Sequence, residues 1–128
     1  MNKLIIDVAN EKIFLMIISN TSIYNITHEN TKINYEKLTM FINDFLISKN
    51  HKITDITEIY VNQGPGSFAG IRNSLSVVKG FKVAKNIDYY CYNLDNFKDE
   101  KDLNYENIPN LCKKYKIKKN LINPIYMS

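Results

Sequence analysis

Short apolar runs separated by polar pairs make up the first part of the chain. The runs rich in Ile, Val, Phe and Tyr are Lys3–Ala9, Lys12–Ser19 and Ser22–His28, and the breaks between them are Asn10-Glu11 and Asn20-Thr21. Two-residue breaks between β-rich runs are typical of hairpins. We therefore expect these three segments to form an antiparallel meander.

From residue 35 onward the apolar spacing becomes helical. In YEKLTMFINDFLISK, residues 35–49, one face of a helix carries Tyr35, Leu38, Ile42, Phe45 and Leu46. Further along, a strand is expected at Glu58–Asn62, a second helix at Phe68–Lys85 with Ser67 as its N-cap, and a fifth strand at Ile87–Tyr92.

The predicted order of elements is β-β-β-α-β-α-β, which is that of a ribonuclease H-like half-domain of the actin and Hsp70 type, the ASKHA fold. Strands four and five each follow a helical crossover, so we expect parallel pairing there, in a mixed sheet with the helices packed on it. We assign residues 1–95 to this α/β domain. Residues 96–128 are expected to form an irregular and partly helical C-terminal tail, in which Pro109 opens a helical turn.

Composition and charge are those of an ordinary globular chain. The 128 residues carry a net charge of +4 and are 45% apolar. The longest clean apolar run near the start, Ile13–Ile18, is too short to cross a membrane. Cys91 and Cys112 are isolated from each other and from any histidine at metal-ligand spacing. We expect a cytoplasmic chain with reduced thiols, no membrane segment and no metal site.

The most distinctive stretch is GPGSFAGIR, residues 64–72, with three glycines and the chain's single arginine, Arg72. A Walker loop needs Lys and then Ser or Thr after its last glycine, whereas Ile71 and Arg72 follow Gly70 here. The spacing GxGxxxG also differs from the dinucleotide fingerprint GxGxxG. Because a helix N-terminus can still attract an anion, two interpretations stay open. The stretch is either a weak phosphate cradle or a tight turn that delivers the second helix against a neighbouring surface.

Metal-dependent catalysis would need several carboxylates at the ends of the central strands. Asp7 ends the first strand, but strand four ends in Asn62 and Gln63, which are poor magnesium ligands. The hairpin after Asp7 reads Val8-Ala9-Asn10-Glu11 and lacks the glycine and hydroxyl of DxGxT, the phosphate-binding hairpin of actin-like ATPases. We therefore expect no complete catalytic site, and we expect Asp7 to cap the hairpin.

The second helix is apolar on two sides. Phe68, Ile71, Leu75 and Val78 form the face expected to pack on the sheet, and Val77, Phe81 and Ala84 lie nearly opposite. Small residues recur in two rows, Gly66-Gly70-Ser74 and Ser76-Gly80-Ala84, and such rows let another backbone come close. On the first helix, Met40 and Ile47 place two apolar residues on an otherwise polar side. The second side of the helix packs either on the chain's own first helix or on a partner protein.

The stretch YVNQGPGSFAGIRNSLSVVKGFKVA, with Asp7 and the segment HENTKINYEKLTMFINDFL, resembles the TsaB family, also called YeaZ. The family signature is similar to GRGPGSFTGVRIGLSxAKG. The positions that match it are Gly64, Pro65, Gly66, Ser67, Phe68, Gly70, Arg72, Leu75, Ser76, Lys79 and Gly80. The likeness extends over residues 3–95, and the terminal NPIYMS resembles the family's closing P-x-Y-L-R, with Ser128 in place of arginine.

The resemblance implies a non-catalytic scaffold in the machinery that makes N6-threonylcarbamoyladenosine in tRNA. Members of that family dimerise with the catalytic paralogue TsaD (YgjD) through the two helices of their N-terminal half, and a TsaE-like ATPase joins the complex. ATP, magnesium and the metal would then be bound by TsaD and TsaE, with no cofactor on the isolated chain, and tRNA would be contacted indirectly. A homodimer through the same helices is a further possibility.

The residues expected at the partner interface are Glu36, Met40, Asn43, Ile47, Arg72, Asn73, Ser76, Val77, Gly80, Phe81 and Ala84. The residues expected to have a structural role in the motif are Asp7, Gly64, Pro65, Gly66, Ser67, Phe68 and Gly70.

The chain also departs from the family pattern. Val8 and Asn10 replace the usual Thr or Ser, Gln63 replaces the motif arginine, and Asn73-Ser74 replaces an apolar-glycine pair. We expect the family's second half-domain to be absent, with residues 96–120 in its place. Two other functions stay open: nucleotide binding through Asp7 and the glycine turn, or RNA binding through the lysines of KKYKIKK at 113–119.

Overall fold

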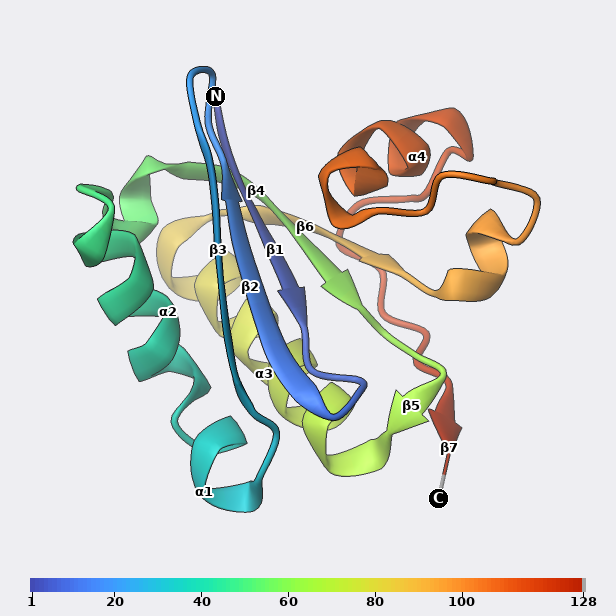
Figure 1. Cartoon of the computed structure of the whole chain (residues 1–128), viewed down its shortest axis with the longest axis horizontal. Helices are drawn as coiled ribbons and strands as arrows, with labels where there is room; N and C mark the ends of the chain where they lie inside the picture. The colour runs from blue at the N-terminus through green and yellow to red at the C-terminus, as the bar shows by residue number, and fades with distance from the viewer. Residues whose placement is uncertain (128) are drawn as a thin grey trace.

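The computed structural model describes residues 1–127, and its centre is a five-stranded sheet in the order β3-β2-β1-β4-β6 (Figure 1). The strands are β1 Asn2–Asp7, β2 Lys12–Ile18, β3 Ile23–Glu29, β4 Ile56–Asn62 and β6 Asp88–Tyr92. β1, β2 and β3 form an antiparallel meander, whereas β4 runs parallel to β1 and β6 runs parallel to β4. The expected α/β fold with a mixed sheet is confirmed.

Helices cover both sides of this sheet. α1 Lys32–Tyr35, α2 Leu38–Ser48 and α3 Phe68–Lys85 lie on one side, and α4 Ile108–Lys114 lies on the other (Figure 1). Short 3-10 turns occupy Ile53–Asp55, Leu94–Phe97 and Tyr105–Asn107. A small parallel ladder joins β5 Gly66–Ser67 to β7 Tyr126–Met127 near the C-terminal end of the chain. None of the helices in residues 1–127 combines the length and the hydrophobicity that crossing a membrane requires.

The first helix is split in two, so the continuous helix expected over residues 35–49 is wrong in its first turn. The Thr31 hydroxyl accepts a hydrogen bond from the Asn34 amide at 3.3 Å and starts α1 at Lys32. The backbone then leaves helical geometry at Lys37, with φ −100° and ψ 17°, before α2 begins at Leu38. The sheet-facing residues of α2 are nevertheless buried as the periodicity predicts, namely Leu38, Ile42, Phe45 and Leu46.

The core has two layers because successive side chains of a strand point to opposite faces of the sheet. Leu4 and Ile6 of β1 belong to the layer beneath α2 and α3, and Ile5 belongs to the layer beneath α4. All three are fully buried. The run of three apolar residues in β1 therefore reflects a strand covered on both faces.

The chain after β6, expected to be a tail, supplies the cover of the second face. Phe97, Ile108, Leu111 and Cys112 are at most 6% exposed and pack against Ile5, Met16, Tyr60 and Tyr92 of the sheet. The chain then returns along β6, where the Asn120 amide donates to the Tyr89 carbonyl at 2.7 Å. It ends beside the glycine motif, where the Ile125 amide donates to the Gln63 carbonyl at 2.8 Å. Ser128 lies outside the described residues.

Asp88 joins this returning segment to the end of α3. Its Oδ1 accepts hydrogen bonds from Asn120 Nδ2 at 2.9 Å and from Lys82 Nζ at 2.7 Å. These two donors stabilise the ionised carboxylate and lower the pKa of Asp88 to about 2. The stabilisation is therefore complete above pH 4 and is lost as the pH falls from about 4 to 2.

We expect Asp88→Asn to lower the free energy of unfolding at pH 7, by under about 1 kcal/mol because the pair is partly exposed. Near pH 2 the variant and the parent protein should be equally stable, since Asp88 is then half protonated and its advantage is largely gone. Urea unfolding at both pH values measures this difference. Asp102→Asn, at an exposed aspartate, is the control and should change little. A deficit that persists undiminished at pH 2 would contradict the assignment.

Candidate functional site

The three glycines of the motif lie against the backbone of their own chain. A Cβ atom on Gly64 would lie 1.9 Å from the Ile125 carbonyl oxygen. The corresponding distances are 2.4 Å from Gly66 to the Ala9 oxygen and 2.1 Å from Gly70 to the Val8 oxygen. Gly64 also has φ +122°, a conformation that residues with a Cβ rarely adopt. The motif, including Pro65 between two of these glycines, therefore joins the β1–β2 hairpin, the C-terminal segment and the start of α3.

Amide groups at the start of α3 are used inside the chain. The Gly70 amide donates to the Ser67 hydroxyl at 3.4 Å, so Ser67 is the N-cap that the sequence predicts. The Ser67 amide donates to the Ala9 carbonyl at 3.0 Å. Of the two interpretations of the motif, the tight turn fits these contacts better than the phosphate cradle.

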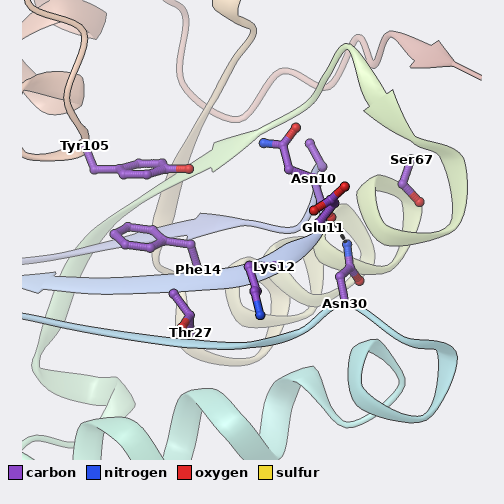
Figure 2. A pocket seen from close by; sticks show the side chains of 9 residues that line it. Asn10, Glu11, Lys12, Phe14, Thr27, Asn30, Ser67 and Tyr105 are labelled. Carbon is purple, nitrogen blue, oxygen red and sulfur yellow. Dashed lines mark hydrogen bonds between the residues drawn. The ribbon is translucent and has the colours of Figure 1, made fainter.

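An open hollow lies between the β1–β2 hairpin, Ser67 and Tyr105. Figure 2 shows Asn10 and Glu11 at the tip of the hairpin, with Tyr105 to one side and Ser67 to the other. Lys12, the cation in the lining, is paired with Glu29. The Glu11 carboxylate, which also lines the hollow, would repel a phosphate group. The composition of the hollow is therefore unfavourable for nucleotide binding.

Asp7 is a buried carboxylate whose oxygens are occupied by the chain's own donors. Oδ1 accepts from the Ala9 amide at 3.0 Å and so caps the hairpin. Oδ2 accepts from Asn62 Nδ2 at 3.2 Å and from the Tyr105 hydroxyl at 2.7 Å. Burial and the Asp7 charge both raise the pKa of Tyr105, which therefore stays a neutral donor. Within residues 1–127 no cluster of three or more His, Cys, Asp or Glu side chains could hold a metal ion.

The neutral residues at the end of β4 are also structural. Asn62 Oδ1 accepts from the Gly64 amide at 2.9 Å, which links Asp7 to the glycine motif. Gln63 Oε1 accepts from the Asn123 amide at 2.8 Å and holds the returning segment. The two thiols, Cys91 and Cys112, are buried, and burial raises the pKa of each to about 12. Neither thiol has the thiolate character that a nucleophile needs.

The outer side of α3, in contrast, is open to solvent. A shallow depression on it is lined by Thr39, Asn73, Ser76, Val77, Gly80, Phe81 and Ala84. A Cβ on Gly80 would meet no atom within 4 Å. Of the two rows of small residues, Gly66-Gly70-Ser74 packs within the chain, whereas Ser76-Gly80-Ala84 has no backbone against it in residues 1–127.

A second depression continues this surface towards the start of α3. Its lining consists of Tyr35, Phe68, Ala69, Arg72, Asn73 and Ser76. Phe68 was expected to pack on the sheet, and that expectation is wrong, since its side chain is 48% exposed. The first turn of α3 instead meets the C-terminal segment, where the Phe68 ring lies 4.6 Å from the ring of Tyr126. The Arg72 guanidinium lies 5.9 Å from the same Phe68 ring.

The neighbouring helix α2 adds two exposed apolar residues, Met40 at 47% and Ile47 at 66%. Glu36 is exposed and Asn43 is half-buried. Val77 and Phe81 pack partly against the first core layer, on the side of α3 that meets α2. The alternative of intrachain packing therefore holds for part of this side, while the row from Ser76 to Ala84 is free. We call the combined outer face of α2 and α3 the α2–α3 face.

The sequence alone did not identify every residue of these depressions. Thr39 lines the first depression and was missed. It lies one helical turn before Asn43, which was expected at the interface, and this four-residue spacing could have identified it. Tyr35 and Ala69 line the second depression. Tyr105, the partner of Asp7, lies 98 residues away in the sequence, and no local pattern points to that contact.

The sequence model of the TsaD family, described as tRNA N6-adenosine threonylcarbamoyltransferase, matches residues 27–93, more than half of the chain. The chain belongs to this family. The matched region includes α2, the glycine motif and α3, and it begins within β3. None of the curated proteins matches the chain.

Solved structures confirm the expected likeness to YeaZ at the level of the fold. YeaZ from Pseudomonas aeruginosa is similar with a TM-score of 0.66 and 18% sequence identity, covering 72% of this chain and 43% of its own length. A second structure, of an uncharacterised protein with similarity to peptidase YeaZ from Pseudomonas aeruginosa, has a TM-score of 0.67, 18% identity and the same coverage. This TsaD-family chain therefore spans less than half the length of these relatives.

A third similar structure is that of RuvC from T. thermophilus in complex with a Holliday junction substrate. It has a TM-score of 0.53 and 11% identity, and the match covers 77% of this chain and 68% of that one. At this identity the likeness concerns the fold alone. The likeness to RuvC therefore says nothing about the role of Asp7, whose carboxylate accepts hydrogen bonds from Asn62 and Tyr105 in this chain.

Proposed function

We propose that this chain is a non-catalytic scaffold subunit in the formation of N6-threonylcarbamoyladenosine in tRNA, and that it docks on a TsaD-like catalytic protein through the α2–α3 face. The observation that carries the proposal is the contrast between the two rows of small residues on α3. In one row Gly66 and Gly70 lie against the chain's own hairpin, whereas in the other a Cβ on Gly80 would meet no atom of residues 1–127 within 4 Å. Membership of the TsaD family supplies the biochemical context.

The chemistry of the α2–α3 face suits a protein partner. Phe68 lines one of the two depressions, small residues of α3 line both, and α2 adds the exposed apolar side chains Met40 and Ile47. Small residues at four-residue spacing let a partner helix approach closely, and the apolar rim excludes water from the contact. Arg72 and Glu36 at the edge provide charges of both signs for orientation.

The Asp7 region supports the non-catalytic part of the proposal. The single buried carboxylate there is engaged by Ala9, Asn62 and Tyr105. Phosphate chemistry at this place would first require the release of Tyr105. The catalytic and ATP-binding groups are accordingly assigned to the TsaD-like and TsaE-like partners.

The docking proposal predicts that Gly80→Arg weakens the complex with the TsaD-like protein of the same organism by at least about a hundredfold. A long charged side chain would fill the depression and separate the two surfaces. Because the site is exposed and a Cβ there meets nothing, the isolated chain should remain folded. Co-purification and titration calorimetry measure binding, and circular dichroism checks the fold.

A second test variant and a control variant complete this experiment. Ile47→Arg changes an apolar residue of the α2–α3 face that is 66% exposed, and Leu121→Arg changes one outside it that is 55% exposed. Docking should be weakened by the first and retained by the second. Undiminished binding of Gly80→Arg and Ile47→Arg would refute docking through this face. If the isolated chain is a homodimer through the same helices, the same variants should convert it to a monomer in sedimentation experiments.

A further inference from the structure

The lysine-rich segment 113–119 follows the second core layer and is not used by the α2–α3 face. It contains five lysines, Lys113, Lys114, Lys116, Lys118 and Lys119, and all are exposed. Lys114 pairs with Glu100 and Lys119 pairs with Asp88. In the part of the chain described by the structure, the other three lysines have no ion-pair partner.

Two of these free lysines line a groove. The groove lies between α4 and the starts of the central strands, and Lys113 and Lys116 line it together with Lys3 of β1. The chain turns sharply here, since Lys116 has φ +54°, and the half-buried Ile117 then packs against the second core layer. The lysines are therefore attached to ordered backbone rather than to a free end.

The groove contains one opposing charge, that of Glu58. This carboxylate accepts a hydrogen bond from the Tyr60 hydroxyl at 3.2 Å and lies 4.0 Å from Lys3 Nζ. The Tyr60 and Tyr90 rings stack at 5.0 Å in the groove wall, and burial together with the Glu58 charge raises the pKa of both phenols. Three lysines thus face a single carboxylate that is already hydrogen-bonded, and the groove has an excess of positive charge.

We propose that this groove and the adjoining Lys118 form a contact surface for the phosphate backbone of RNA, and that in the complex with the TsaD-like protein it holds the tRNA directly. The second part of the proposal rests on the proposed function, whereas binding of RNA by the isolated chain does not. The surface lies on the α4 side of the sheet, opposite to α2 and α3, so one chain could dock on a protein and touch RNA at the same time (Figure 1).

The choice of lysine rather than arginine, and the spacing of these lysines, favour RNA over an acidic peptide as the ligand of this groove. The free charges are flexible lysines at 113, 116 and 118 along a short segment, which suits successive phosphates that need only a point charge. Specific recognition of carboxylates typically uses the planar fork of arginine, and the only arginine, Arg72, belongs to the α2–α3 face. The family to which the chain belongs is named for a tRNA substrate.

The test measures binding of the isolated full chain to a transcribed tRNA over a range of salt concentrations. We expect Lys113→Glu/Lys116→Glu to weaken binding about tenfold and to reduce the slope of log K against log salt by about 2, since each lost phosphate contact removes about one. Lys113→Gln/Lys116→Gln removes the charges without adding new ones and should show most of the same loss. This milder pair keeps the test valid if the reversed pair folds poorly.

The matched control is Lys79→Glu/Lys85→Glu, which makes the same change in net charge at two exposed lysines of α3. It should retain most of the RNA affinity. The proposal would be overturned if both double variants lost the same RNA affinity, because binding would then follow overall charge. It would also be overturned if the parent protein bound polyglutamate or phosphatidylserine vesicles as tightly as it binds tRNA. Complex formation with the TsaD-like protein is measured on the same proteins. Lys113→Glu/Lys116→Glu should retain that complex and Gly80→Arg should retain RNA binding, so a failure of docking and a failure of RNA contact give different results.

Discussion

Replacing Gly70 with alanine is expected to destabilise the folded chain by about 3 kcal/mol or more. The added methyl group would lie 2.1 Å from the Val8 carbonyl oxygen and 3.1 Å from a Val8 side-chain carbon. A flexible side chain could move away, but the close atom belongs to the backbone of the β1–β2 hairpin. That hairpin is anchored by Asp7 and by the core, so either α3 or the hairpin must shift. Urea unfolding followed by circular dichroism measures the loss.

Gly80 provides the matched control within the same helix. A Cβ at Gly80 would meet no atom within 4 Å, so Gly80→Ala removes only the conformational freedom of glycine. We expect this substitution to stabilise the chain by about 0.5–1 kcal/mol. The two Gly→Ala substitutions should therefore have opposite signs, although sequence spacing treats both glycines as members of rows of small residues. A Gly70→Ala variant as stable as the parent protein would show that the hairpin and α3 do not touch as described.

The sequence predicted the main architecture because the signals for it are local. Short β-rich runs separated by two-residue breaks indicate β1 to β3, and the N-cap Ser67 with the helical spacing after it indicates α3; these elements agree with the structure. The first helix was placed less well, because Thr31 caps the start of a short helix at Lys32–Tyr35, and a second helix begins at Leu38 after the backbone leaves helical geometry at Lys37. Helical periodicity by itself does not distinguish one helix from two that share a buried face.

The cover of the second sheet face could not be predicted in the same way. The residues that provide it, such as Phe97 and Ile108, are scattered among charged and turn-forming residues, and their burial depends on long-range contacts with β1, β2 and β4. An indirect signal was present in the unbroken run Leu4-Ile5-Ile6, since a strand with one solvent-exposed face would alternate with polar residues. That run required some later part of the chain, or a partner, to cover the second face.

The positions that helical projection placed on the outer side of α3 are accessible to different degrees. Val77, Gly80 and Ala84 were assigned to an outer side and none is fully buried. Phe68 was misplaced because the projection assumes that the sheet extends beneath the whole helix. At the first turn of α3 the neighbour is Tyr126 of the C-terminal segment instead. A partner for an end residue of a helix depends on the path of the chain elsewhere, and sequence spacing does not contain that path.

The second large effect is expected at Asp7. Asp7→Ala should reduce the free energy of unfolding by about 3–5 kcal/mol, since it leaves the Ala9 amide, the Asn62 side-chain amide and the Tyr105 hydroxyl without their acceptor. The first two contacts are buried, so water replaces the lost bonds poorly. The loss should spread to the glycine motif, because Asn62 also positions the Gly64 amide.

Graded substitutions separate this structural role from a ligand-binding one. Tyr105→Phe removes one of the three donors and should cost about 1.5–2 kcal/mol, because the lost bond is to a carboxylate. Asp7→Asn keeps the shape but offers a single oxygen acceptor, so its stability should fall between that of Tyr105→Phe and that of Asp7→Ala. Calorimetry of the parent protein with ATP and magnesium completes the comparison. If Asp7→Ala were as stable as the parent while abolishing saturable nucleotide binding, Asp7 would be a ligand-binding residue and the scaffold assignment would fall. The network of Ala9, Asn62 and Tyr105 instead favours a carboxylate that fixes the start of α3, and with it the geometry of the α2–α3 face.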